Sequence, residues 1–199
     1  MDFYGREFFV DKRAYVSNSE TERMVDIVLN SIDESKVGTV IDVGTGAGSI
    51  GITIAIERPG VKVIGGEVDW NALQVALINK EGLKVKNYEA FHSNYVNSTK
   101  FSEPDIIVAD LPYGDPDNNL PSSNLEHFKH MPGIALWHPD GKLAAHKGLI
   151  KSILAKGWHC VLFFETGVIS KEEVAEIIPE GLEWKYCPSE GYSVTRIKF

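Results

Sequence analysis

An alternation of strand-like and helix-like segments runs through most of this chain of 199 residues. Short apolar runs, such as VGTVIDVG at 37–44 and VKVIGGE at 61–67, are each followed by a stretch with helical spacing of its apolar residues. Neighbouring parallel strands need a crossover between them, and this crossover is usually a helix that covers one face of the sheet. The sequence therefore predicts an α/β fold with a Rossmann-like, doubly wound sheet.

The last two predicted strands break this alternation. LEWKYC and SVTRIKF follow one another without a helix between them, so we expect them to pair antiparallel. The predicted sheet then has seven strands, mostly parallel, with an antiparallel C-terminal hairpin. Its other expected strands are residues 84–92, 104–110 and 158–165, and its expected helices are residues 49–57, 69–82, 140–156 and 169–178.

Two segments fall outside the regular pattern. Residues 7–16, EFFVDKRAYV, read as a short hairpin around Asp11-Lys12, and a helix is expected after Ser17 to Ser19. We therefore expect a hairpin-and-helix extension over 1–36 ahead of a main domain over 37–199. Residues 114–139 carry four prolines and predict a long connection, which is either a lid or plain irregular structure.

Charge and composition narrow the classes of partner. The net charge of −8 disfavours a broad phosphate-binding face, although a local basic groove remains open. No apolar run approaches the ~20 residues of a membrane span, and the first residues lack the apolar core of a signal peptide. Cys160 and Cys187 are expected to be free thiols. The default expectation is a cytoplasmic protein without a membrane partner.

The turn after the first core strand has the pattern D-x-G-x-G-x-G, over residues 42–48. Glycines permit positive φ and a close approach of a ligand to the backbone, and nucleotide-like ligands lie at this edge of a parallel sheet. Gly46, Gly48 and Gly51 also fit G-x-G-x-x-G, but that register starts three residues past the strand end. The turn therefore suits adenosine with a methionine tail better than a pyrophosphate, and a ligand-free turn is the alternative.

A carboxylate ends the second core strand. Glu67 is the candidate for binding both hydroxyls of a ribose, as acids do at this position in other nucleotide sites. Asp69 competes for this role but is better placed as the N-cap of the next helix.

Five segments together resemble the HemK/PrmC-like family of class I S-adenosylmethionine-dependent methyltransferases, the protein glutamine N5-methyltransferases. ADLPY stands where the family has S-N-P-P-Y, and DVGTGAG resembles its first glycine motif. The other segments are FFVDKRAYVSNSETE, MPGIALWHPDGKLAAHKGLI, and the late pair FFETG and SEGYSVTRI. The resemblance covers nearly the whole chain in order and implies S-adenosyl-L-methionine as the cofactor.

The resemblance also implies roles for individual residues. The acceptor nitrogen would be held by the Asp110 carboxylate and the Leu111 carbonyl, with Pro112 stiffening the turn and Tyr113 offering a flat face. A carboxylate also stabilises positive charge that develops on nitrogen; alternatively, Asp110 only caps the turn. The implied cofactor contacts are Thr21, Asp42, Gly44, Thr45, Gly46, Gly48, Glu67, Val68, Ser93, Asn94 and Asp110.

The chain departs from the family pattern at several places. Asp110 replaces an Asn, Leu111 replaces the first Pro, and Ser93-Asn94 stands where the family has an acid. With about 36 residues before the first core strand, the family's substrate-docking N-terminal domain is expected to be absent. The resemblance implies a protein Gln amide as the acceptor. The alternative is an adenine base or small amine, which Asp110 would suit at least as well. A catalytically inactive cofactor-binding partner subunit is the third alternative.

Three further groups of residues have competing interpretations. His127 and His130 have the spacing of metal ligands, but no third ligand is evident, so no metal is expected. Glu20 and Glu22 either close over the cofactor or simply favour the first turn of a helix. Trp137 and His138 either line the substrate mouth or anchor a packed loop.

Overall fold

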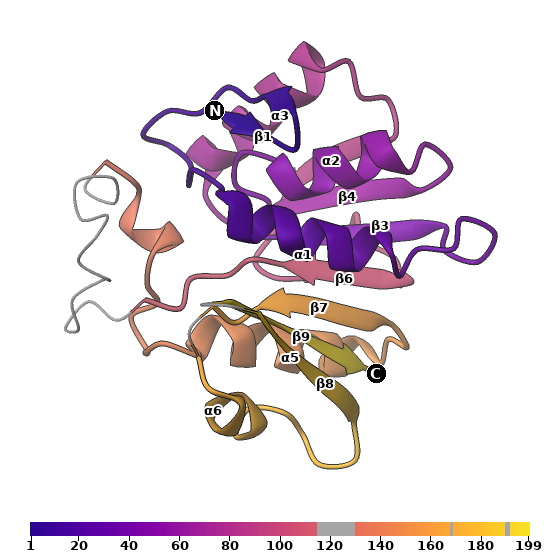
Figure 1. The fold of residues 1–199 in the computed structure, drawn as a ribbon, viewed down its shortest axis with the longest axis vertical. Helices are drawn as coiled ribbons and strands as arrows, with labels where there is room; N and C mark the ends of the chain where they lie inside the picture. Colours follow the sequence, from indigo (N-terminus) through magenta and orange to yellow (C-terminus); the bar gives the residue numbers. More distant parts are fainter. Residues whose placement is uncertain (115–129, 168, 190–191) are drawn as a thin grey trace.

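The computed structural model describes residues 1–114, 130–167, 169–189 and 192–199. Its main sheet has seven strands in the order β5-β4-β3-β6-β7-β9-β8 (Figure 1). Strands β3 to β7 are parallel, and β9 pairs antiparallel with both β7 and β8, which confirms the predicted architecture. The strands are β3 (Thr39–Val43), β4 (Lys62–Glu67), β5 (Tyr88–His92), β6 (Ile106–Ala109), β7 (Val161–Glu165), β8 (Glu183–Ser189) and β9 (Tyr192–Lys198).

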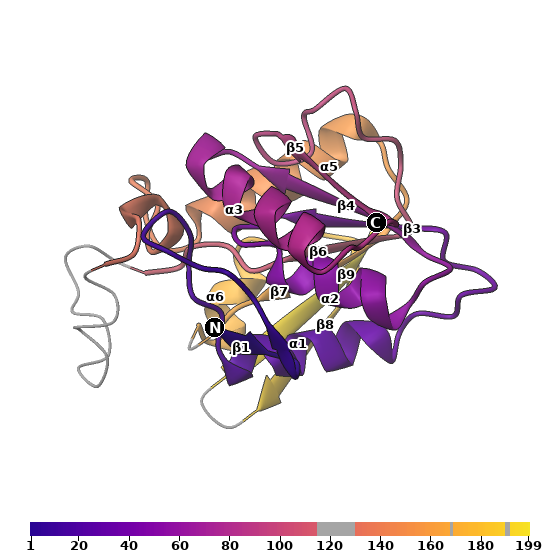
Figure 2. The same ribbon diagram turned by 90° about the horizontal axis from the view of Figure 1, so that it is seen from above.

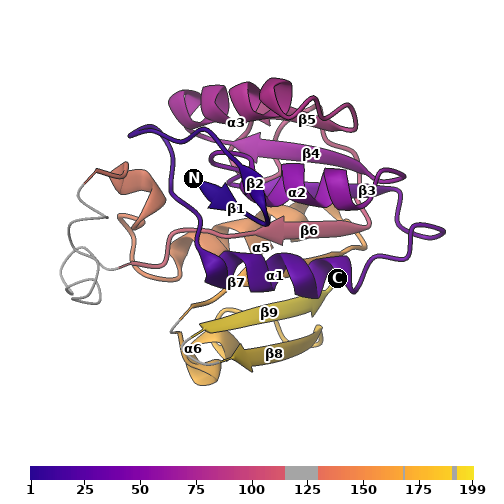
Figure 3. The same cartoon turned by 45° about the horizontal axis from the view of Figure 1, so that its top comes forward.

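Helices cover both faces of this sheet, so alternate residues of a strand enter different cores. Val40 of β3 packs with α1 (Ser19–Leu29) and α2 (Ser49–Glu57), while the next residue, Ile41, packs with α5 (Ala144–Lys156) and the residues around α6 (Lys171–Ala175). Figure 3 shows α1 and α2 in front of the sheet and α5 behind it. The third helix on the α2 side is α3 (Trp70–Gly82), which begins at its N-cap Asp69 as expected.

The hairpin expected around Asp11-Lys12 was placed wrongly. The hairpin consists of β1 (Asp2–Phe3) and β2 (Arg6–Glu7), joined by Tyr4 and Gly5 with φ of 53° and 68°. Two consecutive positive φ angles are what a two-residue hairpin turn of type I′ requires, and Gly5 supplies one of them without strain. The Asp11 carboxylate is instead bound by the Arg13 side chain.

Residues 8–18 form an irregular segment that is fastened along one end of the sheet (Figure 2). Asn79 of α3 accepts a hydrogen bond from the Phe9 N–H and donates to the carbonyls of Phe9 and Ala47. The Ser17 and Ser49 hydroxyls are 2.6 Å apart. These contacts place the segment beside the glycine-rich turn. Phe3 and Phe8 of this N-terminal part share a core with Val40 of β3. The division of the chain into an extension over 1–36 and a main domain over 37–199 stays a prediction.

Helix α6 is shorter than expected. It begins after the Ser170 N-cap, which forms a capping box with Glu173, and ends at Ala175 rather than continuing to residue 178. Pro179 disfavours helical backbone in the residue before it, which helps to explain the early end. Both cysteines carry free thiols, as expected. None of the helices among the described residues is long and apolar enough to cross a membrane.

Candidate active site

A cavity of about 860 Å³ lies at the carboxyl ends of β3, β4 and β6, a size typical of small-molecule sites. The strand order reverses between β3 and β6, because β3 leads outward to β4 while the chain later returns to its other side. Ligands of open α/β sheets bind at such a reversal. The cavity is bordered by residues from 8–18, the glycine-rich turn, and the segment from Pro132 to Lys142, which includes the 3₁₀-helix η1 (Gly133–Ala135).

The glycine-rich turn is held from beneath by Asp42. Its buried carboxylate accepts hydrogen bonds from the Thr45 hydroxyl at 2.6 Å and the Gly51 N–H at 2.9 Å, while burial raises its pKa to about 6. Gly44, Gly46 and Gly48 all have positive φ. Gly44, Thr45 and Gly46 line the cavity, whereas Asp42 and Gly48 lie behind its wall.

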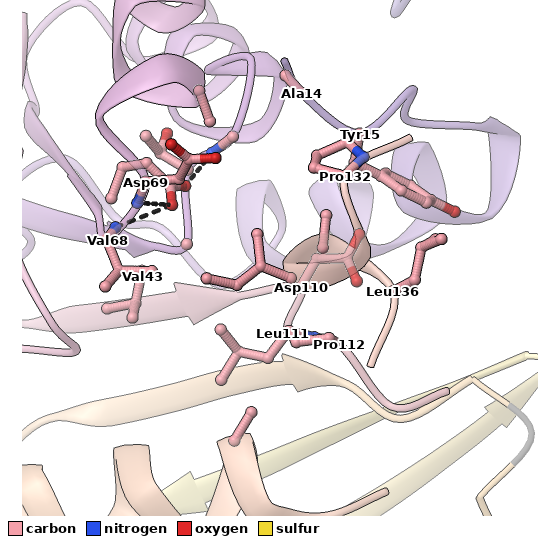
Figure 4. A pocket seen from close by; sticks show the side chains of 18 of the residues that line it. Ala14, Tyr15, Val43, Val68, Asp69, Asp110, Leu111, Pro112, Pro132 and Leu136 are labelled. Carbon is pink, nitrogen blue, oxygen red and sulfur yellow. Dashed lines mark hydrogen bonds between the residues drawn. The ribbon is translucent and has the colours of Figure 1, made fainter. Parts of the chain in front are cut away.

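Glu67 is held in the cavity wall by three backbone N–H groups. One carboxylate oxygen accepts from the N–H groups of Val68 and Asp69, and the other accepts from Gly46 at 2.8 Å, as the dashed lines of Figure 4 show. A carboxylate has about four lone-pair sites, so one remains for a ligand hydroxyl. Burial raises the pKa of Glu67, and the three backbone hydrogen bonds oppose this shift.

Val68, Ser93 and Asn94 border the same end of the cavity. Val68 is 42% exposed, which leaves its side chain available to a planar ligand group. The Ser93 hydroxyl donates to the Tyr95 carbonyl and accepts from the Ser98 N–H, so it is occupied in shaping the turn after β5.

The acid turn follows β6 at the opposite side of the cavity. Asp110, Leu111, Pro112 and Tyr113 all line it, and the Asp110 carboxylate points toward Tyr15 and Leu136 in Figure 4. The turn is braced at its far end because the N–H of Gly114 donates to the Leu136 carbonyl at 2.9 Å. Trp137 and His138 also border the cavity.

Beneath Asp110 lies Glu165, the last residue of β7. Its side chain is 3% exposed and accepts a hydrogen bond from the Tyr113 hydroxyl at 3.1 Å. Asp110 and Glu165 directly follow Ala109 and Phe164, which are paired in the parallel register of β6 and β7, so the two acids are neighbours. Burial raises the pKa of Asp110 to about 7, and burial together with the Asp110 charge raises that of Glu165. Glu165 was not among the residues predicted from the sequence, although an acid ending a buried strand was the available signal.

The remaining candidates from the sequence are dispersed. Thr21 lies behind the wall, with its hydroxyl 3.5 Å from the Asp110 carboxylate, and Glu20 lines the cavity. Glu22 accepts from the Tyr4 N–H and so holds the N-terminal hairpin. His127 lies outside the described residues, as does most of the expected lid. Within the described ranges, no cluster of three or more potential metal ligands occurs.

The site combines a glycine-rich turn at the reversal of strand order, a carboxylate that ends β4 and an acid turn that follows β6. In the sheet that carries it, β9 is inserted antiparallel between β7 and β8. Together these features define the class I S-adenosylmethionine-dependent methyltransferases. The family model for the methyltransferase small domain matches residues 8–125. The chain is 35% identical to the release factor glutamine methyltransferase of Neisseria gonorrhoeae, over 92% of this chain and 67% of that protein. It is 31% identical to the enzyme of the same name from Chlorobaculum tepidum, over 70% of this chain and 50% of that one.

The chain therefore belongs to the methyltransferase small domain family, among its HemK/PrmC-like members. The chain spans between half and two thirds of the length of these relatives. Solved structures agree on the fold alone. The human Mettl16 catalytic domain in complex with a 3′UTR hairpin superposes with a TM-score of 0.72 at 16% identity, covering 98% of this chain and 75% of that one. A 16S rRNA methyltransferase of T. thermophilus in complex with AdoMet and guanosine gives 0.69 at 18%, covering 100% and 49%.

Proposed function

We propose that this protein is an S-adenosylmethionine-dependent N-methyltransferase that acts on a side-chain amide nitrogen of a protein, with Gln as the expected acceptor. The observation that carries the proposal is the position of Asp110 across one cavity from Glu67. Glu67 would hold a ribose hydroxyl of the cofactor through its remaining lone pair, and Gly44 to Gly46 would border its methionine portion. Bound in this way, the cofactor would supply the methyl group for transfer at the acid turn.

The transfer itself is an in-line displacement in which positioning does most of the work. The nitrogen lone pair forms the new N–CH₃ bond while the S–CH₃ bond breaks and its electron pair stays on sulfur, leaving a neutral thioether. The nitrogen becomes positively charged until it releases a proton. Asp110 accepts a hydrogen bond from the acceptor N–H, and Tyr113 and Tyr15, which both line the cavity, supply aromatic surface for a planar group.

An adenine base is the second candidate, because an acid at the position of Asp110 is an equally good acceptor for the exocyclic N–H₂ of adenine. A transfer assay with methyl-labelled cofactor separates the candidates. We expect label in Gln-containing peptides taken from translation release factors, and none in peptides with Gln replaced by Asn. Label that appears only in RNA, DNA or amine pools would refute the amide proposal. Cofactor binding without transfer to any pool would favour the inactive partner subunit.

Gly167 tests whether the position of Tyr113 matters for this transfer. A Cβ added at Gly167 would lie 2.5 Å from the Tyr113 ring, and its φ is +48°. Gly167→Ala is therefore expected to displace the ring and lower kcat about 10- to 100-fold, the scale of a misplaced reacting group. The matched control is Gly157→Ala, which has a φ of +65° but no atom within 4 Å of the added Cβ. It carries similar backbone strain, about 1–2 kcal/mol, and should leave kcat unchanged. Equal losses in both variants would contradict the role of Tyr113.

A further inference from the structure

Asp110, which follows β6, and Glu165, which ends β7, are neighbouring acids, and neither can donate a hydrogen bond to the other while both are ionised. Glu165 is buried, the Tyr113 hydroxyl donates to its Oε1, and no N–H or O–H group of the described residues donates to its Oε2. Asp110 lies beside Glu165, because the residues just before them, Ala109 of β6 and Phe164 of β7, are paired in the sheet. Ionised carboxylates only accept hydrogen bonds, so Asp110 can supply the donor that the buried Oε2 of Glu165 lacks only if one of the two acids carries a proton.

The surroundings of the pair are mostly acidic or neutral. Among the described residues, the titratable groups around the pair are Tyr15 of the segment 8–18, Glu20 of α1, Asp42 of β3, Tyr113 of the acid turn, His146 of α5 and Tyr192 of β9, and the charge of Arg23 of α1 acts on Tyr192. Glu20 and Asp42 are acids and favour the protonated state of the pair.

The two basic neighbours do not reverse this balance. His146 donates from Nε2 to the Glu165 backbone carbonyl, and burial lowers its pKa to about 4, so the imidazole is neutral. The charge of Arg23 lowers the pKa of Tyr192, whereas the pKa values of both acids stay raised in its presence. Two like charges this close in a buried site disfavour each other, so the pair keeps at least one proton at neutral pH.

We propose that Asp110 and Glu165 act as one proton-sharing unit, in which Glu165 is a positioning residue that holds Asp110 as a carboxylic acid and fits the acceptor site to a neutral N–H₂ group rather than to an ammonium ion. This inference rests on the proposed function. In this state the Asp110 hydroxyl donates to Glu165, and its carbonyl oxygen is left to accept from the acceptor nitrogen. An Asn at this position would make the same two hydrogen bonds, with its N–H₂ in place of the O–H.

Sharing a proton also gives the reaction a proton acceptor. When the acceptor nitrogen becomes positively charged, its proton passes to the Asp110 carbonyl oxygen while the Asp110 hydroxyl proton passes to Glu165. Both acids then end neutral, and the nitrogen is neutral with its new methyl group. An Asn cannot take part in this relay, although it can still orient the nitrogen.

Infrared spectroscopy of the full chain without substrate tests the shared proton directly. The wild-type protein is expected to show the C=O band of a protonated carboxylic acid at pH about 7, and both Asp110→Asn and Glu165→Gln should lose it. Each variant supplies an amide N–H where the acid proton was, so the remaining acid can ionise. Asp42→Asn is the matched control, because Asp42 is a second buried acid with a raised pKa, and the band should survive in it. A wild-type spectrum without the band, or a band that both variants retain, would overturn the proposal.

Stability against pH gives a second readout without activity. The pKa of Asp110 is raised in the folded state, so the stability it contributes is present in full below the unfolded value of about 4 and is lost as the pH rises through about 7. The Tm of the wild type should therefore fall more steeply between pH about 5 and 8 than the Tm of Asp110→Asn. Equal slopes would count against the shared proton. If the band and the slope are present but no amide is methylated, the proposed function fails and the proton-sharing pair stands.

Discussion

Replacing Asp110 by alanine is expected to lower kcat about 100- to 1,000-fold, the loss that follows removal of one preorganised hydrogen-bonding group at a reacting centre. Asp110 lines the cavity at the end of β6, and no other residue of the acid turn has an ionisable oxygen at that place except the Tyr113 hydroxyl, which donates to Glu165. Single-turnover assays with saturating cofactor measure the effect on the transfer step.

The matched control is Asp110→Asn, which keeps the shape and one acceptor oxygen and can donate to Glu165. Its kcat should fall less than that of Asp110→Ala, because the variant loses the proton relay but keeps the hydrogen bond to the acceptor nitrogen. The cofactor Kd should change by less than tenfold, about 1.4 kcal/mol, in both variants, because Glu67 is held by the N–H groups of Gly46, Val68 and Asp69 and not by Asp110. An alanine variant with unchanged turnover would remove Asp110 from the mechanism.

Replacing Glu67 by alanine should raise the Kd of S-adenosylmethionine at least 100-fold. The variant loses the carboxylate that binds the ribose and also leaves the N–H groups of Gly46, Val68 and Asp69 without their acceptor. Hydrogen bonds to a charged group contribute about 1.5–3 kcal/mol each, so losing one ligand bond and the ordered turn reaches this magnitude. Isothermal titration calorimetry with the cofactor and with S-adenosylhomocysteine provides the measurement.

Asp69→Ala serves as the control for Glu67. Asp69 is an acid two residues away that also borders the cavity, but its carboxylate accepts from the Asn71 N–H as the N-cap of α3. Its loss should lower the free energy of unfolding by about 1 kcal/mol and leave the cofactor Kd nearly unchanged. If both variants weaken binding equally, Asp69 shares the ribose role that we assign to Glu67.

The fold was largely predictable because its signals are local. Most strands of the parallel core are short apolar runs, and α1, α3 and α6 each begin after a residue whose side chain caps the helix, such as Asp69 before α3. The misplaced hairpin shows where local signals fail. Asp11-Lys12 and Tyr4-Gly5 are both acceptable turns, and the choice between them depends on what Phe3 and Phe8 can pack against.

Some residues of the candidate site also carry local sequence signals, and others do not. The glycine-rich turn, Glu67 and the acid turn could be named from the sequence because strand ends and turn residues mark them. Glu165 also ends a strand, but its hydrogen-bond partner Tyr113 lies 52 residues away, so the strand pattern does not show what it bonds to. Asn79 could not be named, because its partner Phe9 lies 70 residues away in the chain. Tyr15 could not either, because it belongs to a segment without regular structure whose path depends on such distant contacts.

The sequence by itself determined the class of fold, the family and the position of Asp110 at the end of a core strand. It also revealed that an acid replaces the family's amide. Only the tertiary structure decided what that acid is chemically. The parallel pairing of β6 with β7 brings Glu165 beside Asp110 in a buried site, and burial makes one shared proton more stable than two negative charges. The sequence thus shows which side chains can carry a charge. The groups that the fold places around such a side chain decide whether it is protonated.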